Sequence, residues 1–256
     1  MILSALEISD YKNAVLQIAH GDPFACRIIS LYNSYKPTLA FVDYWLVADE
    51  NGTANGAIAR NGSNFILFLT DKTDLEEVSS FMRVAGATGV LCGGEYTLDL
   101  FGAATISGVV MKKEKPFEGD EMQAIQPDIR AAYELIVRCA DESFTPPPFE
   151  DFYVDVNHKL RHGAMRLYGI AEGDTLAAVA MTVAESESGA VLGAVACDPA
   201  YRRHGFGSAI VKYITNRLVA ENKTVFLHRA QNANAAFYSN LGFEECGTWR
   251  EYSMKY

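Results

Sequence analysis

The stretch AVLGAVACDPAYRRHGFGSAIVKYITNRLV, residues 190–219, decides the fold of this chain. Its apolar first part, residues 190–197, predicts a buried strand, and Asp198-Pro199 ends that strand because proline has no N–H to donate to a β-ladder. The sequence RRHGFG then predicts a turn. After the turn, apolar residues recur four positions apart, as on one face of a helix, at Ile210, Ile214 and Leu218. The stretch therefore predicts a strand, a glycine turn and a helix as one unit.

The glycine turn has the chemistry of a diphosphate site. Gly205 and Gly207 allow the backbone to approach a ligand closely, and the positive end of the following helix dipole attracts an anion. Arg202 and Arg203 add cationic donors. A dinucleotide-binding fingerprint needs a third glycine where this chain has Ile210, and the lysine of a P-loop is missing as well. The turn therefore favours a phosphate ligand but disfavours both of those nucleotide-binding motifs.

Two motifs of the second half resemble the GNAT superfamily of N-acetyltransferases. Arg202, Gly205 and Gly207 match its R-x-x-G-x-G signature, behind a V-A-C-D-P strand end. Residues 234–243, NAAFYSNLGF, are similar to its A-x-x-F-Y-x-x-L-G-F segment, at the expected distance beyond a strand predicted at residues 224–228. The resemblance covers about residues 116–256. It implies the acyl-CoA N-acyltransferase fold, an α/β fold with a mixed central sheet flanked by helices.

The resemblance also implies which residues bind acetyl-CoA, the cosubstrate. In these enzymes the central strand splays from its neighbour, and its backbone pairs with the pantetheine arm as though the arm were another strand. The positions that carry over to this strand are Val195, Ala196 and Cys197. Those that carry over to the diphosphate turn are Arg202, Arg203, His204, Gly205, Phe206, Gly207 and Ser208. We interpret Cys197 as a small apolar residue rather than a nucleophile, because its sequence neighbours are apolar and include no activating base.

Three positions depart from the family pattern. Gln231 stands where an asparagine is frequent, seven residues before the tyrosine of the second motif, and Asn232 follows it. The coenzyme contact made there is expected at Gln231 or Asn232, or is lost. Asn234 replaces a small alanine, and Phe226 occupies a position at which some members carry a glutamate base. The identity of the base is therefore open.

Tyr238 and His228 are the predicted catalytic residues. Tyr238 matches the family's acid, since a phenol near the sulfur can protonate the departing thiolate. An amine with a pKa of ~10 must lose a proton before it attacks a thioester. His228 is the first candidate to accept that proton, with Glu185 and Glu187 as alternatives. Without a catalytic role, Tyr238 would be an aromatic packing residue and His228 a polar residue at the end of a strand.

The composition of the chain disfavours several classes of partner and site. The chain has 256 residues, 49% of them hydrophobic, and a formal net charge of −10 at pH 7. This acidic balance disfavours nucleic acid and anionic membranes as partners and suits a cationic amine. Five scattered cysteines without C-x-x-C spacing indicate neither a disulfide framework nor a zinc site. We therefore expect no metal and, because no signal sequence or membrane-spanning run is apparent, a cytoplasmic location.

The first half shows the succession of elements that is expected in the second. After two N-terminal helices, strands are predicted at residues 39–48, 56–60 and 64–69, a helix at 74–85, and strands at 90–92 and 105–111. A degenerate repeat and an unrelated α+β domain both fit this order. The turn at residues 70–73, TDKT, holds neither glycine nor arginine, so we expect no coenzyme diphosphate there.

We predict two domains in tandem, joined through the charged segment at residues 112–121. Residues 1–115 form a degenerate acetyltransferase-like domain that helps to shape the acceptor site, and residues 116–256 form the catalytic domain. The predicted function is transfer of an acetyl group from acetyl-CoA to a primary amine of a small molecule, peptide or protein by direct attack. The alternative is an acyl-CoA binding or sensing module that transfers nothing.

A basic segment near residue 160 has two interpretations. His158, Arg161 and His162 contact an acidic part of the substrate, or they form a solvated helix end at which positive charge is favourable. The sequence specifies neither the acceptor amine nor an oligomeric state.

Overall fold

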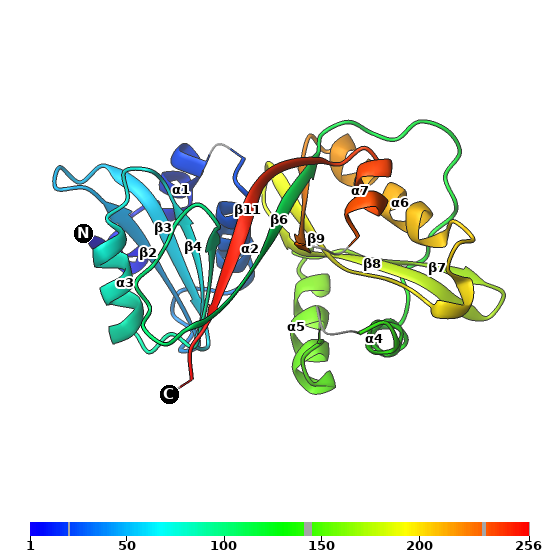
Figure 1. Cartoon of the computed structure of the whole chain (residues 1–256), viewed down its shortest axis with the longest axis horizontal. Helices are drawn as coiled ribbons and strands as arrows, with labels where there is room; N and C mark the ends of the chain where they lie inside the picture. Colours follow the sequence, from blue (N-terminus) through cyan, green and yellow to red (C-terminus); the bar gives the residue numbers. More distant parts are fainter. Residues whose placement is uncertain (20, 141–144, 232–233, 256) are drawn as a thin grey trace. The chain divides into compact units, whose positions relative to one another are not determined.

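The computed structural model describes residues 1–19, 21–140, 145–231 and 234–255. The chain divides into two compact units, one made of Met1–Val110 with Glu245–Tyr256 and the other of Met111–Glu244. Each unit contains a β-sheet with helices on both faces (Figure 1). This is the predicted α/β class, present twice.

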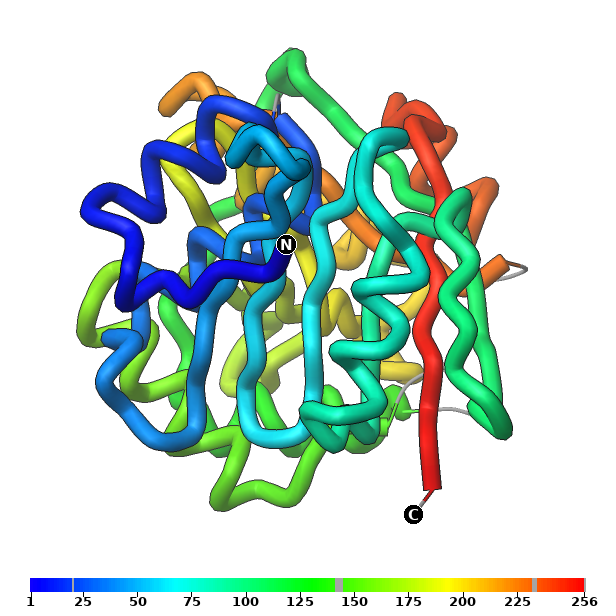
Figure 2. Tube along the Cα trace, turned by 90° about the vertical axis from the view of Figure 1, so that its left-hand side faces the viewer, coloured from blue at the N-terminus to red at the C-terminus, as the bar shows by residue number. Residues whose placement is uncertain are grey.

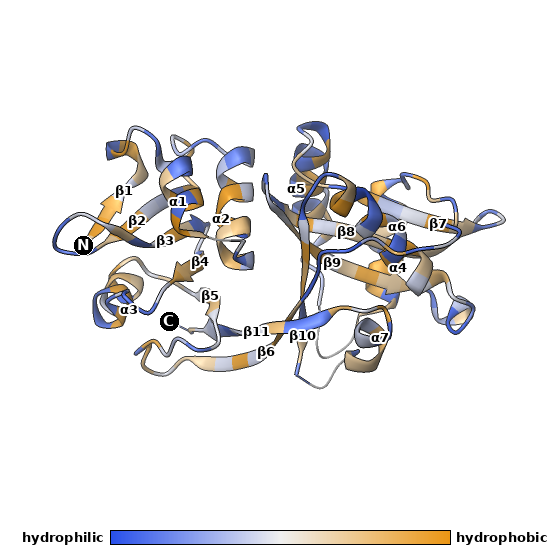
Figure 3. Ribbon diagram, turned by 90° about the horizontal axis from the view of Figure 1, so that it is seen from above, coloured by the Kyte–Doolittle hydropathy of each residue, from blue (hydrophilic) through white to orange (hydrophobic). Residues whose placement is uncertain are grey.

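The first unit is built on a sheet with the strand order β1-β2-β3-β4-β5-β11. The pair β4 and β5 is parallel, and the other pairs are antiparallel. Helices α1 and α2 cover one face of this sheet and α3 covers the other (Figure 3). The bounds are β1 (Ile2–Ser4), η1 (Ala5–Glu7), α1 (Tyr11–Ala19), α2 (Pro23–Ser34), β2 (Val42–Ala48), β3 (Ala54–Asn61), β4 (Asn64–Leu69), α3 (Leu75–Val84), β5 (Gly89–Gly93), β6 (Ala104–Lys113) and β11 (Glu244–Ser253).

The second unit has the strand order β10-β9-β8-β7. The pair β9 and β10 is parallel, and β7, β8 and β9 form an antiparallel meander. Helices α4 and α5 lie on one face of this sheet, with α6 and α7 on the other (Figure 1). The bounds are α4 (Ile129–Arg138), α5 (Phe149–Arg161), β7 (Leu167–Glu172), β8 (Thr175–Glu185), β9 (Gly189–Cys197), η2 (Pro199–Tyr201), α6 (Phe206–Ala220), β10 (Thr224–Ala230) and α7 (Ala235–Asn240).

The two units share one plan. Each has two helices, an antiparallel meander of three strands, a helix, and a strand that pairs in parallel with the last strand of the meander. An unrelated α+β domain with the same order of elements would not be expected to reproduce the strand pairing as well. The tandem arrangement is therefore confirmed.

The last strand of the chain belongs to the first unit. β11 pairs with β5 in the antiparallel sense, from Trp249 opposite Gly93 to Ser253 opposite Gly89. Figure 2 shows this red strand beside the other elements of that unit. Tyr252 is 5% exposed in the core that α3 covers, and its hydroxyl accepts a hydrogen bond of 2.9 Å from the Leu98 N–H. The compact units therefore differ from the predicted division at residues 115 and 116, because the strand that completes the first sheet comes from the C-terminus.

The expected linker is anchored to α6. The N–H of Phe117 donates to the Asn216 side chain at 2.7 Å, and Asn216 donates back to the Phe117 carbonyl at 3.2 Å. Glu121 forms an ion pair with Arg217, one residue along the same helix. The charged segment is therefore held along the second unit, although its composition is typical of a linker.

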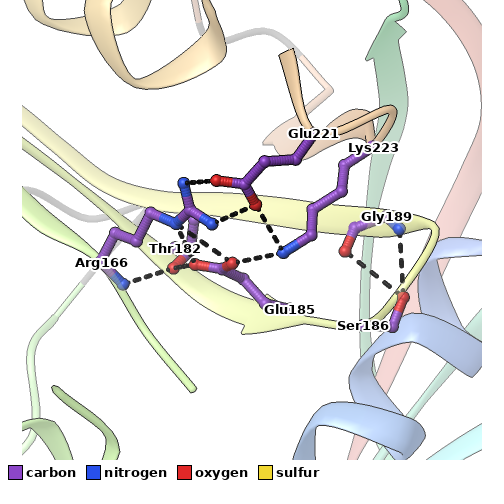
Figure 4. A network of polar contacts seen from close by, with 7 residues as sticks. All are labelled: Arg166, Thr182, Glu185, Ser186, Gly189, Glu221 and Lys223. Carbon is purple, nitrogen blue, oxygen red and sulfur yellow. Dashed lines mark hydrogen bonds and ion pairs between the residues drawn. The ribbon is translucent and has the colours of Figure 1, made fainter. Parts of the chain in front are cut away.

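A buried carboxylate organises the edge of the second unit at which β8 ends (Figure 4). Glu185 is 7% exposed and accepts hydrogen bonds from Arg166 at 3.2 Å, Lys223 at 2.9 Å and the Thr182 hydroxyl at 2.8 Å. Glu221 completes the network through Arg166, at 2.6 and 2.8 Å. Two cations thus compensate the buried charge, which indicates a structural role.

Among the residues described, no helix combines the length and the apolar character that a membrane crossing requires.

A chain that ends at Glu244 tests the role of β11. We expect the first unit to lose stability, because β5 becomes an edge strand and the core loses Tyr252. Hydrogen exchange should show faster exchange in β5 and α3, with little change in β8 and β9. The variant Tyr252→Phe serves as the milder comparison, since it removes only the hydroxyl that accepts from the Leu98 N–H and, at 3.4 Å, from Arg250, at a cost of ~1–2 kcal/mol. Unchanged protection of β5 in the shortened chain would contradict this assignment.

Candidate functional site

β9 and β10 pair only over their first halves. The parallel pairing ends at Leu192 opposite Leu227, although both strands continue. On its other edge β9 stays paired with β8 as far as Cys197. Within the described chain, residues 193–197 thus have a β-ladder on one edge and no parallel partner from β10 on the other. An extended ligand with its own N–H and C=O groups can pair with such an edge.

The open segment contains a bulge. Between the pairs Val179–Ala196 and Met181–Gly193, β9 has one residue more than β8. Ala194 lies there with a φ of 47°, a left-handed conformation that is uncommon for alanine. Because a bulge bends a strand and increases its local twist, it gives a physical reason for β9 to leave β10 at this level.

The turn after β9 leaves the start of α6 without a side-chain cap. Gly205 precedes the helix with a φ of 89° and has no side chain to accept from the first N–H groups. By contrast, three other helices begin at aspartates whose carboxylates accept from those groups, namely Asp22, Asp74 and Asp128. Residues 202–205 are exposed. The positive end of the α6 dipole is therefore open to an anion.

Two side chains of the α4 terminus hold the end of β9. Arg138 donates from Nε and Nη2 to one oxygen of Asp198, at 3.2 and 3.0 Å. The thiol of Cys139 donates to the backbone oxygen of Cys197 at 3.2 Å. Sequence reasoning missed Arg138, because a single arginine in the last turn of a helix carries no signal of a partner that lies far away in the chain.

The thiol of Cys197 is not activated. Burial raises its pKa, and a hydrogen bond from the Gly207 N–H has a smaller, opposing effect. Since the thiolate is the nucleophilic form, a raised pKa makes the side chain less reactive. This agrees with its interpretation as a small apolar residue.

Gly207 is the point at which the two sequence motifs meet. A methyl group built on Gly207 would lie 3.7 Å from the Cβ of Cys197 and 3.8 Å from the ring of Phe237 in α7. The next residue, Tyr238, is 9% exposed and packs edge-on against Phe237 and Phe243. Burial raises the pKa of its hydroxyl to about 12. The start of α6, the end of β9 and α7, which carries the buried Tyr238, therefore lie in one region of the second unit.

Known proteins show the same architecture. Residues 167–253 match the family described as FR47-like protein. The tandem GNAT protein from the clavulanic acid biosynthesis pathway is 15% identical, with a TM-score of 0.57 over 99% of this chain and 98% of that one. The GCN5-related N-acetyltransferase from Sphaerobacter thermophilus is 13% identical, with a TM-score of 0.64 over 99% and 95%. A GNAT-family acetyltransferase from Colwellia psychrerythraea is 14% identical, with a TM-score of 0.57 over 100% of both chains. The chain has a tandem GNAT fold. No curated protein sequence matches it.

Within this GNAT fold, the candidate bases lie far apart. His228 is half-buried in β10, one residue beyond the last pair with β9, where the strands part. Glu185 pairs with Ala190 at the opposite end of β9, so it lies about 23 Å along the strand from Cys197 at ~3.3 Å per residue. Glu187 is exposed in the same hairpin. Both glutamates are therefore too distant to act as the base beside Cys197.

The structure places differently the residues at which the two motifs depart from the GNAT pattern. Gln231 is exposed after β10, and its backbone carbonyl accepts from Arg229 at 2.7 Å. Asn232 lies outside the described residues. Asn234 precedes α7 with a φ of 57°, a left-handed conformation that asparagine adopts more readily than alanine does. That backbone geometry is a physical reason for asparagine at this position.

The corresponding turn of the first unit is filled by its own side chains. The Asp74 carboxylate accepts from the N–H groups of Glu76 and Glu77, at 3.0 Å each. The Thr73 hydroxyl accepts from the Thr70 N–H at 3.0 Å. β3 and β4 pair in unbroken register. A carboxylate thus occupies the place where a phosphate would bind, which is the physical reason to expect no coenzyme there.

A hollow of about 480 Å³ follows one face of α5. Its lining includes the three basic residues that the sequence singled out, and the Nδ1 atom of His162 is 2.8 Å from the His158 carbonyl oxygen. The lining residues are Tyr153, Val154, Asn157, His158, Arg161 and His162. In the described ranges, no cluster of three or more His, Cys, Asp or Glu side chains could hold a metal ion.

The two glycines of the turn should differ in their effect on stability. Gly205→Ala forces alanine into a left-handed conformation, which costs ~1–2 kcal/mol. Gly207→Ala places its methyl group at ordinary contact distance and should change the free energy of unfolding by less than ~1 kcal/mol. Denaturant unfolding of both variants measures the difference. Equal losses of stability would show that the helix start is not organised as described.

Proposed function

We propose that the second unit transfers an acetyl group from acetyl-CoA to a primary amine, in the cytoplasm. The observation that carries this proposal is the parting of β9 from β10 directly before an uncapped, glycine-rich helix start. One open strand edge suits the amide groups of pantetheine, and the adjoining helix dipole suits the diphosphate. The first unit, with Asp74 in the equivalent place, binds no coenzyme in this proposal.

In the proposed complex, the backbone at residues 195–197 pairs with the pantetheine arm. Of the N–H groups from Arg203 to Ser208, that of Gly207 already donates to the thiol of Cys197, and the others surround the diphosphate in this proposal. Arg202 adds positive charge. The coenzyme supplies an activated acyl group as a thioester. The residues of this chain hold that group beside the amine, which converts a bimolecular reaction into an effectively unimolecular one.

Two residues handle protons in this proposal. His228, where β10 leaves β9, takes the proton of the amine directly or through a water molecule as the carbon–nitrogen bond forms. Tyr238 donates to the sulfur as the carbon–sulfur bond breaks. A phenol with a pKa of about 12 stays protonated at neutral pH, so it is available as a donor. The acetyl group passes directly to the amine, without an acyl-enzyme.

An acyl-CoA binding or sensing module is the second candidate function. The open strand edge and the uncapped helix start fit it equally well, because both features serve binding and neither requires transfer of the acyl group. A module that only binds the coenzyme needs no such transfer.

Tyr238→Phe separates the two candidates. If Tyr238 is the acid, the rate of acetyl transfer to a panel of polyamines, amino acids and peptides should fall by a factor of ~10²–10⁴, with affinity for acetyl-CoA nearly unchanged. Tyr168→Phe, in β7, is the matched control and should keep full activity. Tight binding of acetyl-CoA by wild type without acceptor-stimulated thiol release would favour the sensor. A covalent acetyl adduct trapped on the protein during turnover would contradict direct transfer to the amine.

Gly207→Ala tests the proposed coenzyme site. Because the added methyl group meets the protein at ordinary contact distance but adds bulk within the turn proposed to hold the diphosphate, we expect affinity for acetyl-CoA to fall more than ~10-fold, while the melting temperature stays close to wild type. Calorimetric titration measures the affinity. Unaltered binding would place the coenzyme elsewhere.

A further inference from the structure

Two lysines share one aromatic ring at the side of α6. The Nζ atom of Lys113, at the end of β6, lies 4.4 Å from the ring centroid of Phe117, and the Nζ atom of Lys212 lies 5.6 Å from the same centroid. The two positive charges are therefore within about 10 Å of each other. All three side chains are half-buried. The cluster lies in the second unit, which is proposed to bind the coenzyme.

These two lysines lack the carboxylate partners that their neighbours have. Lys112 pairs with Glu114 at 3.0 Å, and Arg217 pairs with Glu121. Within the described parts of the chain, neither Lys113 nor Lys212 takes part in an ion pair. Acidic residues outnumber basic ones in this protein, 32 to 22, so carboxylates are not scarce. Two like charges held together without a counter-ion form a site that an anion would stabilise.

The position of the cluster relates it to the glycine turn. Ser208 and Lys212 are four residues apart and share one face of α6. At ~1.5 Å per residue, Lys212 is about 10 Å along the helix axis from Gly205. Helical side chains lean toward the N-terminus, which brings the Lys212 stem closer to the turn. The ammonium group of Lys113 lies 3.3 Å from where a Cβ on Gly242, after α7, would be. The cluster thus lies beside α6 and close to the residue that follows α7.

We infer that Lys113, Phe117 and Lys212 form a subsite for the ribose 3′-phosphate of the coenzyme. This inference rests on the proposed binding of the diphosphate at the start of α6. In coenzyme A the 3′-phosphate is one ribose unit away from the diphosphate, so a second anion site within one or two helical turns is the arrangement that the ligand requires. Lysine ammonium groups bind phosphate as point charges. The ring of Phe117, held by its backbone on Asn216, keeps both ammonium groups on one side of the helix.

The test compares coenzyme A with 3′-dephospho-coenzyme A by calorimetric titration. Wild type should bind coenzyme A at least ~10-fold more tightly than the dephosphorylated ligand. In the double variant Lys113→Gln/Lys212→Gln that ratio should fall to about one, with affinity for the dephosphorylated ligand within twofold of wild type. Lys112→Gln removes a paired lysine from the same segment and should keep the wild-type ratio. Higher salt should reduce the ratio in wild type and leave the double variant unaffected.

The outcomes are distinct. A ratio that survives in the double variant, or an equal loss of affinity for both ligands, would overturn the subsite and leave the proposed coenzyme binding intact. No binding of either ligand to wild type would overturn both proposals. Circular dichroism and melting temperature show whether the double variant is folded, and Phe117→Leu gives a second measurement. That variant keeps both charges but frees their positions, so its ratio should fall between those of wild type and the double variant.

Discussion

The second unit depends on the point at which β9 and β10 stop pairing. A sheet normally satisfies both edges of its central strands, and an open edge in the middle of a sheet is unfavourable unless something else satisfies it. Here the bulge at Ala194 and the turn at Gly205 lie at the two ends of one short segment. Between them is a strand edge with which an extended ligand could pair in place of a strand. The helices and hairpins around it keep that segment in position, with Arg138 and Cys139 fixing its end.

The two units share one arrangement of strands and helices but differ in strand pairing and in how the central helix begins. In the first unit β3 and β4 pair without a break, and Asp74 satisfies the start of the helix that follows. In the second unit the equivalent strand has a bulge, and the equivalent helix begins at Gly205 without a cap. In both units the parallel pairing stops before the strands end, in the first unit at Ile66 opposite Leu91. The units therefore differ in the bulge and at the helix start, where the carboxylate of Asp74 already accepts from the N–H groups that an anion would bind.

Local signals account for what the sequence predicted well. The strand, glycine turn and helix around Gly205 were predictable because glycine, proline and four-residue spacing each act over a few positions. The tandem plan followed from the order of such segments. Partners that are remote in sequence were not predictable: Arg138 with Asp198, or Glu185 with Lys223. Glu185 is a candidate base by sequence, because it precedes β9 in the chain, but strand register places it at the opposite end of that strand from Cys197. Sequence proximity to a strand does not say which end of the strand a residue serves.

The C-terminal strand has a consequence for synthesis on the ribosome. Leu98 and its hydrogen-bond partner Tyr252 are 154 positions apart, so the first unit cannot close its sheet until the residues of β11 have been translated. At ~5–20 residues per second this is a delay of roughly 8–30 s, during which the outer edge of β5 has no partner. The usual vectorial order, in which an N-terminal domain folds first, is therefore reversed for the last step. A nascent chain stalled before residue 245 would expose that edge to other chains, and a chaperone that covers strand edges would be most useful in that interval.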